Sequence, residues 1–170
     1  VSGPFGAVKE QASGLYAQTM AERGFLTIAF DPSFTGESGG APRYMSSPDI
    51  NTEDFLSSVD YLVCREDVDG DRVGIIGICG WGGIALNAAA ADPRIKATLA
   101  STMYDLCRIS GNGYNDSADD AATRIASRKL VAAQRTADRL SGEQALTGGV
   151  ADPMPDDAPQ FAKDYHAYYK

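Results

Sequence analysis

A short apolar run followed at once by an alanine-rich helical pattern constrains this chain more than any other feature. The run covers residues 73–78, and the helical pattern continues from about residue 80 to residue 91. A buried strand that passes directly into a helix needs a sharp turn, and small residues let the backbone make that turn without steric clashes. Glycines stand on both sides of the turn, and Cys79 is the one reactive side chain within it. The sequence therefore predicts a strand, a tight turn that carries a cysteine, and a helix.

Cys79 occupies the place of a catalytic nucleophile in this turn. The usual nucleophile-elbow pattern is G-x-S-x-G, and residues 77–81 read Gly-Ile-Cys-Gly-Trp, with Trp81 where the second small residue is expected. At the first turn of a helix, unpaired backbone N–H groups and the positive end of the helix dipole favour a thiolate. The amide of Gly80 is also placed to hold the oxyanion that forms when the sulfur attacks a carbonyl. We therefore predict Cys79 as the nucleophile and Gly80 as one oxyanion donor.

Two other interpretations of the same turn stay open. Free cysteine is among the most buried residue types, so Cys79 could serve packing alone. Residues 80–85 also match G-x-G-x-x-A after a strand, a pattern typical of dinucleotide binding. That motif usually opens the first strand–helix unit of its domain and has an acidic ribose partner about 20 residues further on. Here an earlier strand–helix unit precedes it, although Asp105 lies near the expected acidic position.

Composition narrows the class of protein. The 170 residues fit one domain, and the formal net charge of −8 makes nucleic acid and anionic membranes poor partners. No apolar run approaches the roughly 18 residues of a membrane-spanning helix. The three cysteines, Cys64, Cys79 and Cys107, lack metal-ligand spacing and are odd in number, which indicates reduced thiols in a cytoplasmic protein rather than a disulfide scaffold. We predict no bound metal and no cofactor.

The rest of the pattern predicts a parallel α/β sheet. Helices are expected over residues 7–23 and 51–63, a buried strand over 25–30, and a further strand over 95–101 after the elbow helix. Strands that alternate with helices in this way form βαβ units, in which the strands are parallel and helices cover both faces of the sheet.

After the expected strand over residues 95–101 the sequence becomes more polar and charged. Met103 and Tyr104 follow its carboxyl end, where α/β sheets place ligands, and together with Trp81 they suggest a partly apolar substrate pocket. Beyond them a polar loop leads into a long charged helix. We expect residues 1–109 to form part of an α/β core and residues 110–170 to form a helical lid or cap.

Three motifs give the chain a family resemblance. They are Gly-Pro-Phe-Gly-Ala-Val-Lys-Glu-Gln at residues 3–11, Asp31 with Gly-Glu-Ser-Gly-Gly at residues 36–40, and Gly-Ile-Cys-Gly-Trp-Gly-Gly at residues 77–83. With these motifs the chain resembles bacterial α/β-hydrolases related to dienelactone hydrolase, over nearly its whole length. The resemblance implies a three-layer α/β-hydrolase fold, here partial, with a mostly parallel sheet and a helical lid insertion.

The resemblance also implies roles for individual residues. Cys79 matches the family's nucleophile, and Gly80 matches the adjacent oxyanion donor. The other donor comes from the loop after the third strand, where Phe5 is the best match because Pro4 has no N–H. Where dienelactone hydrolases carry a glutamate that partners the resting thiol, this chain has Gly3.

The family's acid and histidine follow the seventh and eighth strands, which have no counterpart in this pattern. The one histidine, His166, lies in a helix-like run with no strand before it, so we expect a solvent-facing or interhelical residue. We therefore expect the chain to be part of a longer protein whose base and acid lie outside it. A remnant of three or four strands exposes apolar edges, and we expect a second fragment or another copy of the chain as its partner.

These observations favour a hydrolase that cleaves a small carboxylic ester, lactone or thioester through Cys79. The alternative is a non-catalytic hydrolase-like module that binds a small ligand or partner through the same pocket and lid, a view supported by the missing base and by the bulky Trp81. A dinucleotide-binding domain is a third and more distant hypothesis.

Overall fold

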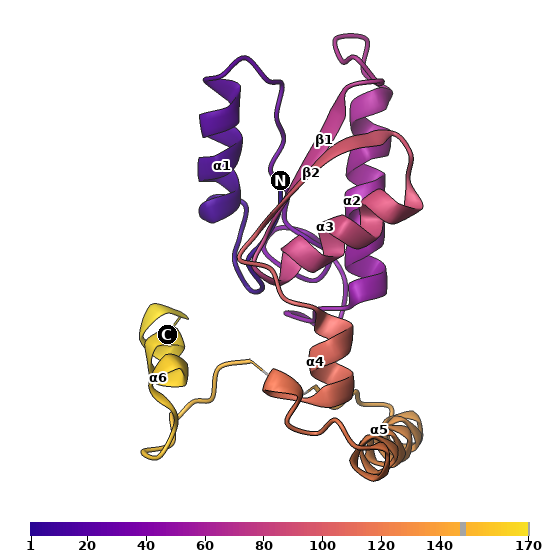
Figure 1. Ribbon diagram of the computed structural model, residues 1–170, viewed down its shortest axis with the longest axis vertical. Coiled ribbons are helices and arrows are strands. Elements are labelled where there is room, and N and C mark those ends of the chain that lie inside the picture. The colour runs from indigo at the N-terminus through magenta and orange to yellow at the C-terminus, as the bar shows by residue number, and fades with distance from the viewer. Residues whose placement is uncertain (147–148, 170) are drawn as a thin grey trace. The chain divides into compact units, whose positions relative to one another are not determined.

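The computed structural model describes residues 1–146 and 149–169 (Figure 1). In chain order its elements are α1 (Ala12–Ala21), α2 (Pro48–Val63), β1 (Val73–Ile78), α3 (Gly80–Ala91), β2 (Ile95–Ser101), α4 (Leu106–Asn112), the 3-10 helix η1 (Tyr114–Asp116), α5 (Ala121–Ser141) and α6 (Gln160–Tyr169). The chain divides into two compact units, Val1–Leu130 and Val131–Lys170. The first unit holds both strands and the cysteine turn.

Strands β1 and β2 form a parallel pair at the centre of the first unit. Their register pairs Val73 with Ile95 and Ile78 with Ser101. Helix α3 connects the two strands and packs against both. Figure 1 shows α1 on one side of the strands and α2 and α3 on the other. The predicted bounds of β1, α3 and β2 are confirmed, and so is the parallel pairing of the two strands.

The first two residues extend this sheet beside β1. The N–H of Ser2 donates to the carbonyl of Ile76 (3.1 Å), and its carbonyl accepts from the N–H of Ile78 (3.1 Å). On the other side, the backbone nitrogen of Val1 donates to the carbonyl of Ile28 (2.9 Å). This dipeptide therefore lies between β1 and the segment that contains Ile28.

The prediction of a buried strand over residues 25–30 is wrong. The segment has no strand ladder, and the side chains of Phe25 and Leu26 are 56% and 48% exposed. A strand needs a row of hydrogen bonds to a neighbour, and the bond from Val1 to Ile28 does not extend into such a row. The apolar composition suits a strand interior, but composition alone does not supply the pairing segment.

Two helix starts differ from the predicted ones. Helix α1 begins at Ala12 instead of residue 7. The preceding residues form a turn in which the Gln11 N–H donates to the Val8 carbonyl (3.0 Å), and the Gln11 side chain accepts from the Val8 N–H (3.1 Å). Helix α2 begins at Pro48 instead of residue 51, because proline fits the first turn of a helix, where its missing N–H costs nothing.

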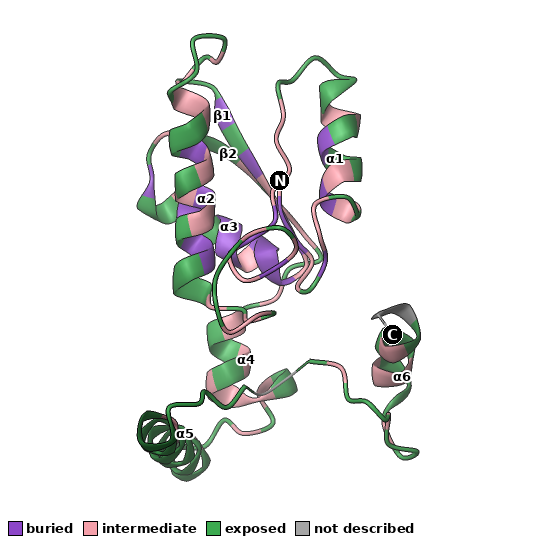
Figure 2. Ribbon diagram, turned by 180° about the vertical axis from the view of Figure 1, so that it is seen from behind, coloured by how far each residue is buried: buried purple, intermediate pink, exposed green. Residues whose placement is uncertain are grey.

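The core of the first unit lies between the strands and helices α2 and α3. Figure 2 shows buried residues gathered on β1, α2 and α3. Trp81 of α3 and Phe55 of α2 are among the largest fully buried side chains. Their rings and that of Phe30 meet edge to face, with centroids 5.2, 5.7 and 6.0 Å apart. Such contacts add to the free energy gained by burying the rings, so this aromatic cluster fixes α2 against α3.

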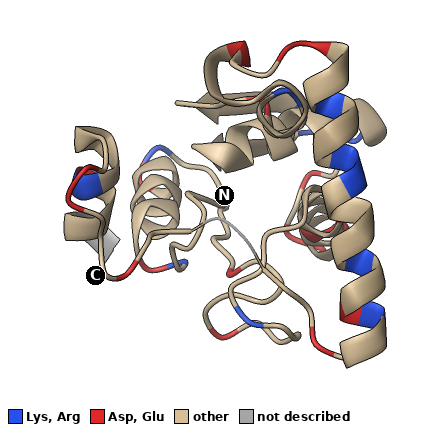
Figure 3. Cartoon of the chain, turned by 90° about the horizontal axis from the view of Figure 1, so that it is seen from below, with Lys and Arg blue, Asp and Glu red and all other residues tan. Residues whose placement is uncertain are grey.

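Helix α5 is long, basic and exposed. Figure 3 shows lysine and arginine recurring along it, and it has no buried residue. The division between the two units falls within α5, between Leu130 and Val131. The division into a partial core over residues 1–109 and a lid over residues 110–170 stays a prediction. That the C-terminal segment acts as a lid stays a prediction. Among the described residues, no helix has both the length and the apolar character needed to cross a membrane.

Replacing Phe55 with alanine should lower the free energy of unfolding of the whole protein by about 3–5 kcal/mol, because loss of a buried ring leaves a cavity. Tyr61→Ala provides the control, since Tyr61 lies on the same helix and is 56% exposed. That change should cost less than about 1 kcal/mol. Urea titrations followed by circular dichroism measure both, and equal costs would contradict the core described above.

Candidate functional site

Cys79 is held in a strained backbone conformation between β1 and α3. Its φ of 60° and ψ of −129° lie where residues with side chains are rare. Its N–H donates to the carbonyl of Ser101 at the end of β2 (2.8 Å), and its carbonyl accepts from the N–H of Gly82 (2.9 Å). A conformation of this kind costs about 1–3 kcal/mol and persists only where its surroundings impose it. The half-buried Cys79 is therefore presented by both strands and by the start of α3.

The turn is tight because two glycines leave room for other parts of the chain. A Cβ atom on Gly77 would lie 2.1 Å from the carbonyl oxygen of Trp81. One on Gly80 would lie 2.0 Å from the ring of Phe5. Both distances are far below van der Waals contact. A side chain at position 77 would collide with backbone, and one at position 80 would require the ring of Phe5 to move. Phe5 thus packs directly on the first residue of α3, next to Cys79.

The loop that carries Phe5 approaches the elbow equally closely. Gly3 has a φ of 104°, and a Cβ atom there would lie 2.2 Å from the carbonyl oxygen of Ile78. The hydroxyl of the buried Ser13 donates to the carbonyl of Gly3 (2.8 Å). Because every side chain begins with a Cβ atom, this backbone excludes a glutamate at position 3. A glutamate partner for the resting thiol cannot come from this position.

The backbone amides of Phe5 and Gly80 form no hydrogen bond within the described part of the chain. Gly80 follows Cys79 in sequence, and the ring of Phe5 packs on Gly80. Backbone N–H groups beside a nucleophile can hold a developing oxyanion. The structure brings both predicted donor residues to the elbow, and their role as donors stays a prediction.

Two of the three predicted substrate-binding residues also lie near the elbow. The rings of Tyr104 and Phe5 meet edge to face with centroids 6.4 Å apart. Met103 is 42% exposed and lies against Gly82, where an added Cβ atom would be 2.5 Å from the Cβ of Met103. Trp81, by contrast, is 1% exposed and belongs to the aromatic core. Its position does not favour the predicted substrate contact, because its side chain projects from α3 toward Phe55 of α2.

A salt bridge between Asp31 and Lys9 was not predicted from the sequence. One carboxylate oxygen of Asp31 accepts from the N–H of Lys9 (2.7 Å), and the other accepts from the ammonium of Lys9 (2.9 Å) and from the N–H of Glu37 (3.0 Å). Burial opposes ionisation of this carboxyl, but the hydrogen bonds from Glu37 and Lys9 outweigh it and hold the pKa of Asp31 below its usual value. Hydrogen bonds to Glu37, Asp31 and Glu10 raise the pKa of Lys9.

A sequence signal for Asp31 exists, because this residue follows an apolar run and belongs to one of the motifs behind the family resemblance. Lys9 also belongs to one of these motifs, residues 3–11. It lies 22 residues away from Asp31, and nothing in the local pattern pairs the two.

The histidine of the chain lies in the second unit. His166 is part of α6, and its Nε2 atom is 3.9 Å from a carboxylate oxygen of Asp152. The first unit, which holds Cys79, contains no histidine. The structure therefore does not assign His166 as the base for Cys79.

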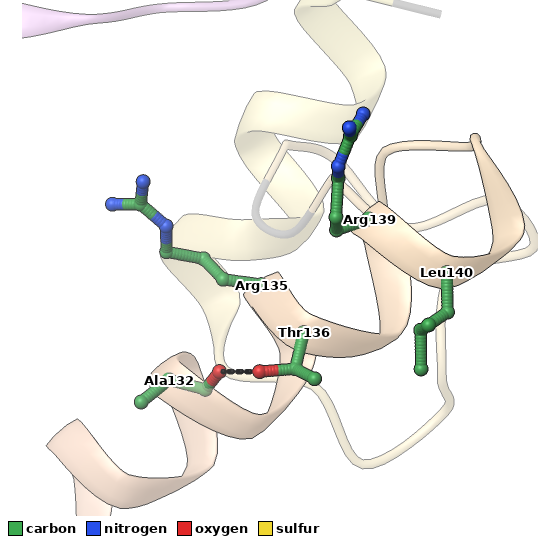
Figure 4. Close-up of a pocket in the computed structure, with 5 residues that line it drawn as sticks. All are labelled: Ala132, Arg135, Thr136, Arg139 and Leu140. Atoms are coloured by element: carbon green, nitrogen blue, oxygen red, sulfur yellow. Dashed lines mark hydrogen bonds between the residues drawn. The ribbon is translucent and has the colours of Figure 1, made fainter.

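A hollow on α5 offers no competing site. It is lined by Ala132, Arg135, Thr136, Arg139 and Leu140 (Figure 4). The hydroxyl of Thr136 donates to the Ala132 carbonyl of the same helix (3.2 Å), and Leu140 is 83% exposed. The hollow is one exposed face of a helix without a nucleophile. Across the described residues, no group of three or more His, Cys, Asp or Glu side chains could hold a metal ion.

Comparison with known proteins identifies the family. The model of the dienelactone hydrolase family matches residues 8–105. The chain is 55% identical to "Uncharacterized protein PA2218" of Pseudomonas aeruginosa, over 99% of this chain and 45% of that protein. The crystal structure of the Pseudomonas protein matches with a TM-score of 0.85, over 98% of this chain and 51% of that chain.

More distant relatives extend the comparison. The chain is 28% identical to "Thiohydrolase aneE" of Aspergillus aculeatus, over 84% of this chain and 44% of that protein. The crystal structure of "Alpha/beta hydrolase GrgF" from Penicillium shares the fold, with 24% identity and a TM-score of 0.68 over 96% of this chain and 54% of that chain. These matches confirm the predicted resemblance and fold. The chain spans about half the length of the curated relatives it matches.

Gly3→Ala should destabilise the whole protein by about 3 kcal/mol or more, because it adds a steric clash to the cost of a positive φ. Gly6→Ala separates the two effects, since Gly6 has a φ of 77° with no atom within 4 Å of an added Cβ. This control should cost about 1–2 kcal/mol. Urea titration of both variants measures the difference, and equal costs would argue against the close approach of Gly3 to Ile78.

Proposed function

The chain belongs to the dienelactone hydrolase family and has its α/β-hydrolase fold, and from this premise we propose that the whole protein cleaves a small carboxylic ester, lactone or thioester through Cys79. The backbone of Cys79 is the observation that carries the proposal. A cysteine with φ near 60°, placed between a buried strand and the first turn of a helix, has the geometry of a nucleophile elbow. A cysteine that served packing alone would not need this strained conformation.

In the proposed reaction the Cys79 thiolate attacks the carbonyl carbon of the substrate, and the carbonyl electron pair moves onto oxygen. The amides of Gly80 and Phe5 hold the resulting oxyanion. When the oxyanion collapses, the bond to the alcohol or thiol breaks, and this leaving group takes a proton from a histidinium elsewhere in the whole protein. Water then attacks the acyl–cysteine, giving one proton back to that histidine, and the carboxylic acid and the thiolate are released.

The surroundings of the elbow support a small and partly apolar acyl group. The ring of Phe5, the ring of Tyr104 and the half-exposed Met103 gather at the start of α3. A relative of the chain is named a thiohydrolase, and this name supports thioesters within the proposed substrate class. A thioester also suits a cysteine nucleophile, because the attacking and leaving groups are then both sulfur.

The second candidate is a non-catalytic module that binds a small ligand at the same elbow. The observation that favours it is the lack of a histidine in the first unit. The dinucleotide hypothesis has less support, because Asp105 caps α4 by accepting a hydrogen bond from the N–H of Arg108 (2.9 Å). The glycines of α3 serve close packing, since Gly80 and Gly82 lie against Phe5 and Met103.

Two wider expectations remain part of this proposal. Large apolar side chains such as Leu15, Phe25 and Leu99 are 48–64% exposed, which supports a further partner surface from the whole protein or from another copy of the chain. The cysteines at positions 64, 79 and 107 are all free, which supports a reducing compartment such as the cytoplasm.

A p-nitrophenyl acetate titration of the whole protein tests the function. We expect a burst of p-nitrophenol equal to the concentration of protein, because acylation of Cys79 precedes slower hydrolysis. Cys79→Ala should abolish the burst, and prior treatment with iodoacetamide should do the same. Cys107→Ala is the matched control, since Cys107 is an exposed free thiol, and it should keep the full burst. A burst that survives in Cys79→Ala would remove the mechanism.

A further inference from the structure

One buried carboxylate connects the loop that carries Phe5 with the loop that follows Asp31. The side chain of Asp31 is 3% exposed, and both of its oxygens accept hydrogen bonds. The N–H and the ammonium of Lys9 approach from the Phe5 loop, and the N–H of Glu37 approaches from the other loop. The Lys9 ammonium also contacts the carboxylate of Glu37 (2.7 Å). Asp31 and Lys9 together therefore fasten the two loops to each other.

The loop after Asp31 is itself held in place by hydrogen bonds to α2, which is part of the core. The N–H and the hydroxyl of Ser33 both donate to the carboxylate of Asp54 on α2 (3.1 and 2.6 Å). The amide of Asn51 donates to the same carboxylate (2.9 Å). At Gly36 an added Cβ atom would lie 2.3 Å from the Asp31 carboxylate, so the loop wraps closely around this group. The loop that begins at Asp31 is therefore held against α2, and Lys9 is bound to that loop through Asp31.

Phe5 lies between two fixed points of its own loop. At one end, Gly3 is wedged against Ile78 and bound by the hydroxyl of Ser13 (2.8 Å). At the other end, Lys9 is bound by Asp31. Between them, the buried Ala7 closes a turn through its N–H, which donates to the carbonyl of Pro4 (3.1 Å). The position of the Phe5 amide therefore depends on both ends of the loop.

We propose that Asp31 is a positioning residue for the reaction: through Lys9 it holds the amide of Phe5 where that amide meets the oxyanion. This inference rests on the proposed function and adds a residue that acts without touching the substrate. An oxyanion donor is effective only within about 2.7–3.1 Å of the developing charge, and loss of one donor slows catalysis about 100- to 1,000-fold. A small shift of the loop is enough to weaken the Phe5 donor.

Asp31→Asn in the whole protein tests the proposal. Both carboxylate oxygens accept from backbone N–H groups. The amide nitrogen of asparagine cannot accept a hydrogen bond, so one of these two bonds is lost. We expect the rate of acylation by p-nitrophenyl acetate to fall about 10- to 100-fold, with the apparent KM changed less than about threefold. Alkylation of Cys79 by iodoacetamide forms no oxyanion, so its rate should stay within about twofold of the wild-type rate.

Two variants complete the series. Asp67→Asn is the matched control, because Asp67 is an exposed carboxylate held by Arg65 (2.6 Å) and the substitution is the same. It should leave acylation unchanged. Lys9→Met keeps the backbone N–H and removes only the ammonium, so it should slow acylation less than Asp31→Asn. If Asp31→Asn does not fold, the acylation rate of Lys9→Met tests the proposal in its place. An unaltered rate in Lys9→Met would then overturn the proposal.

The remaining outcomes separate this proposal from the function on which it rests. Equal losses of acylation and alkylation in Asp31→Asn would mean that Asp31 supports the elbow as a whole, which overturns the positioning role. A wild-type protein without a burst would overturn the proposed function. In that case hydrogen exchange still measures how firmly Asp31 holds the loop, because Asp31→Asn should speed exchange at the Ala7 amide at least about tenfold. Unchanged exchange at Ala7 would overturn the role of Asp31 independently of activity.

Discussion

The architecture depends on backbone that approaches backbone without intervening side chains. At the end of β1, the loop at Gly3 and the first turn of α3 converge so closely that Gly3 and Gly77 leave no room for a Cβ atom. This convergence permits a turn sharp enough to hold Cys79 with a positive φ. It also places Trp81, two residues later, deep in the aromatic core. The turn that holds Cys79 and the aromatic core are thus consequences of the same close contact, so the turn is supported by a well-packed part of the molecule.

Local patterns predicted β1, α3 and β2 correctly because each carries its own signal: an apolar run, an alanine-rich stretch, and a second apolar run. Residues 25–30 have an equally apolar run and form no strand, because pairing depends on a neighbour that composition does not report. Trp81 illustrates a second limit. The motif places this residue two positions after Cys79, but the direction of its side chain is set by the packing of α3 against α2.

The residues that meet at the Cys79 turn were predicted where they are consecutive or belong to a recognisable motif, and their roles stay predictions. Cys79 and Gly80 follow from one turn, and Phe5 follows from the family resemblance. The ionic link between Asp31 and Lys9 could not be derived, because it joins residues far apart in the chain and consists of one carboxylate meeting two kinds of donor. The comparison with relatives establishes the family without naming such links. They become visible only when hydrogen bonds of buried groups are accounted for individually.

The pairing of Ser2 with Gly77 has a consequence for how the molecule acquires its fold. Parallel neighbours so distant in sequence must close a long loop before they gain any free energy from pairing, and such topologies fold slowly. During synthesis Ser2 leaves the ribosome before β1 exists, so the aromatic and aliphatic side chains near Ser2 spend that interval without their final neighbours. We therefore expect early chaperone contact with the stretch between Ser2 and β1, and we expect this contact to end when residues 73–78 emerge.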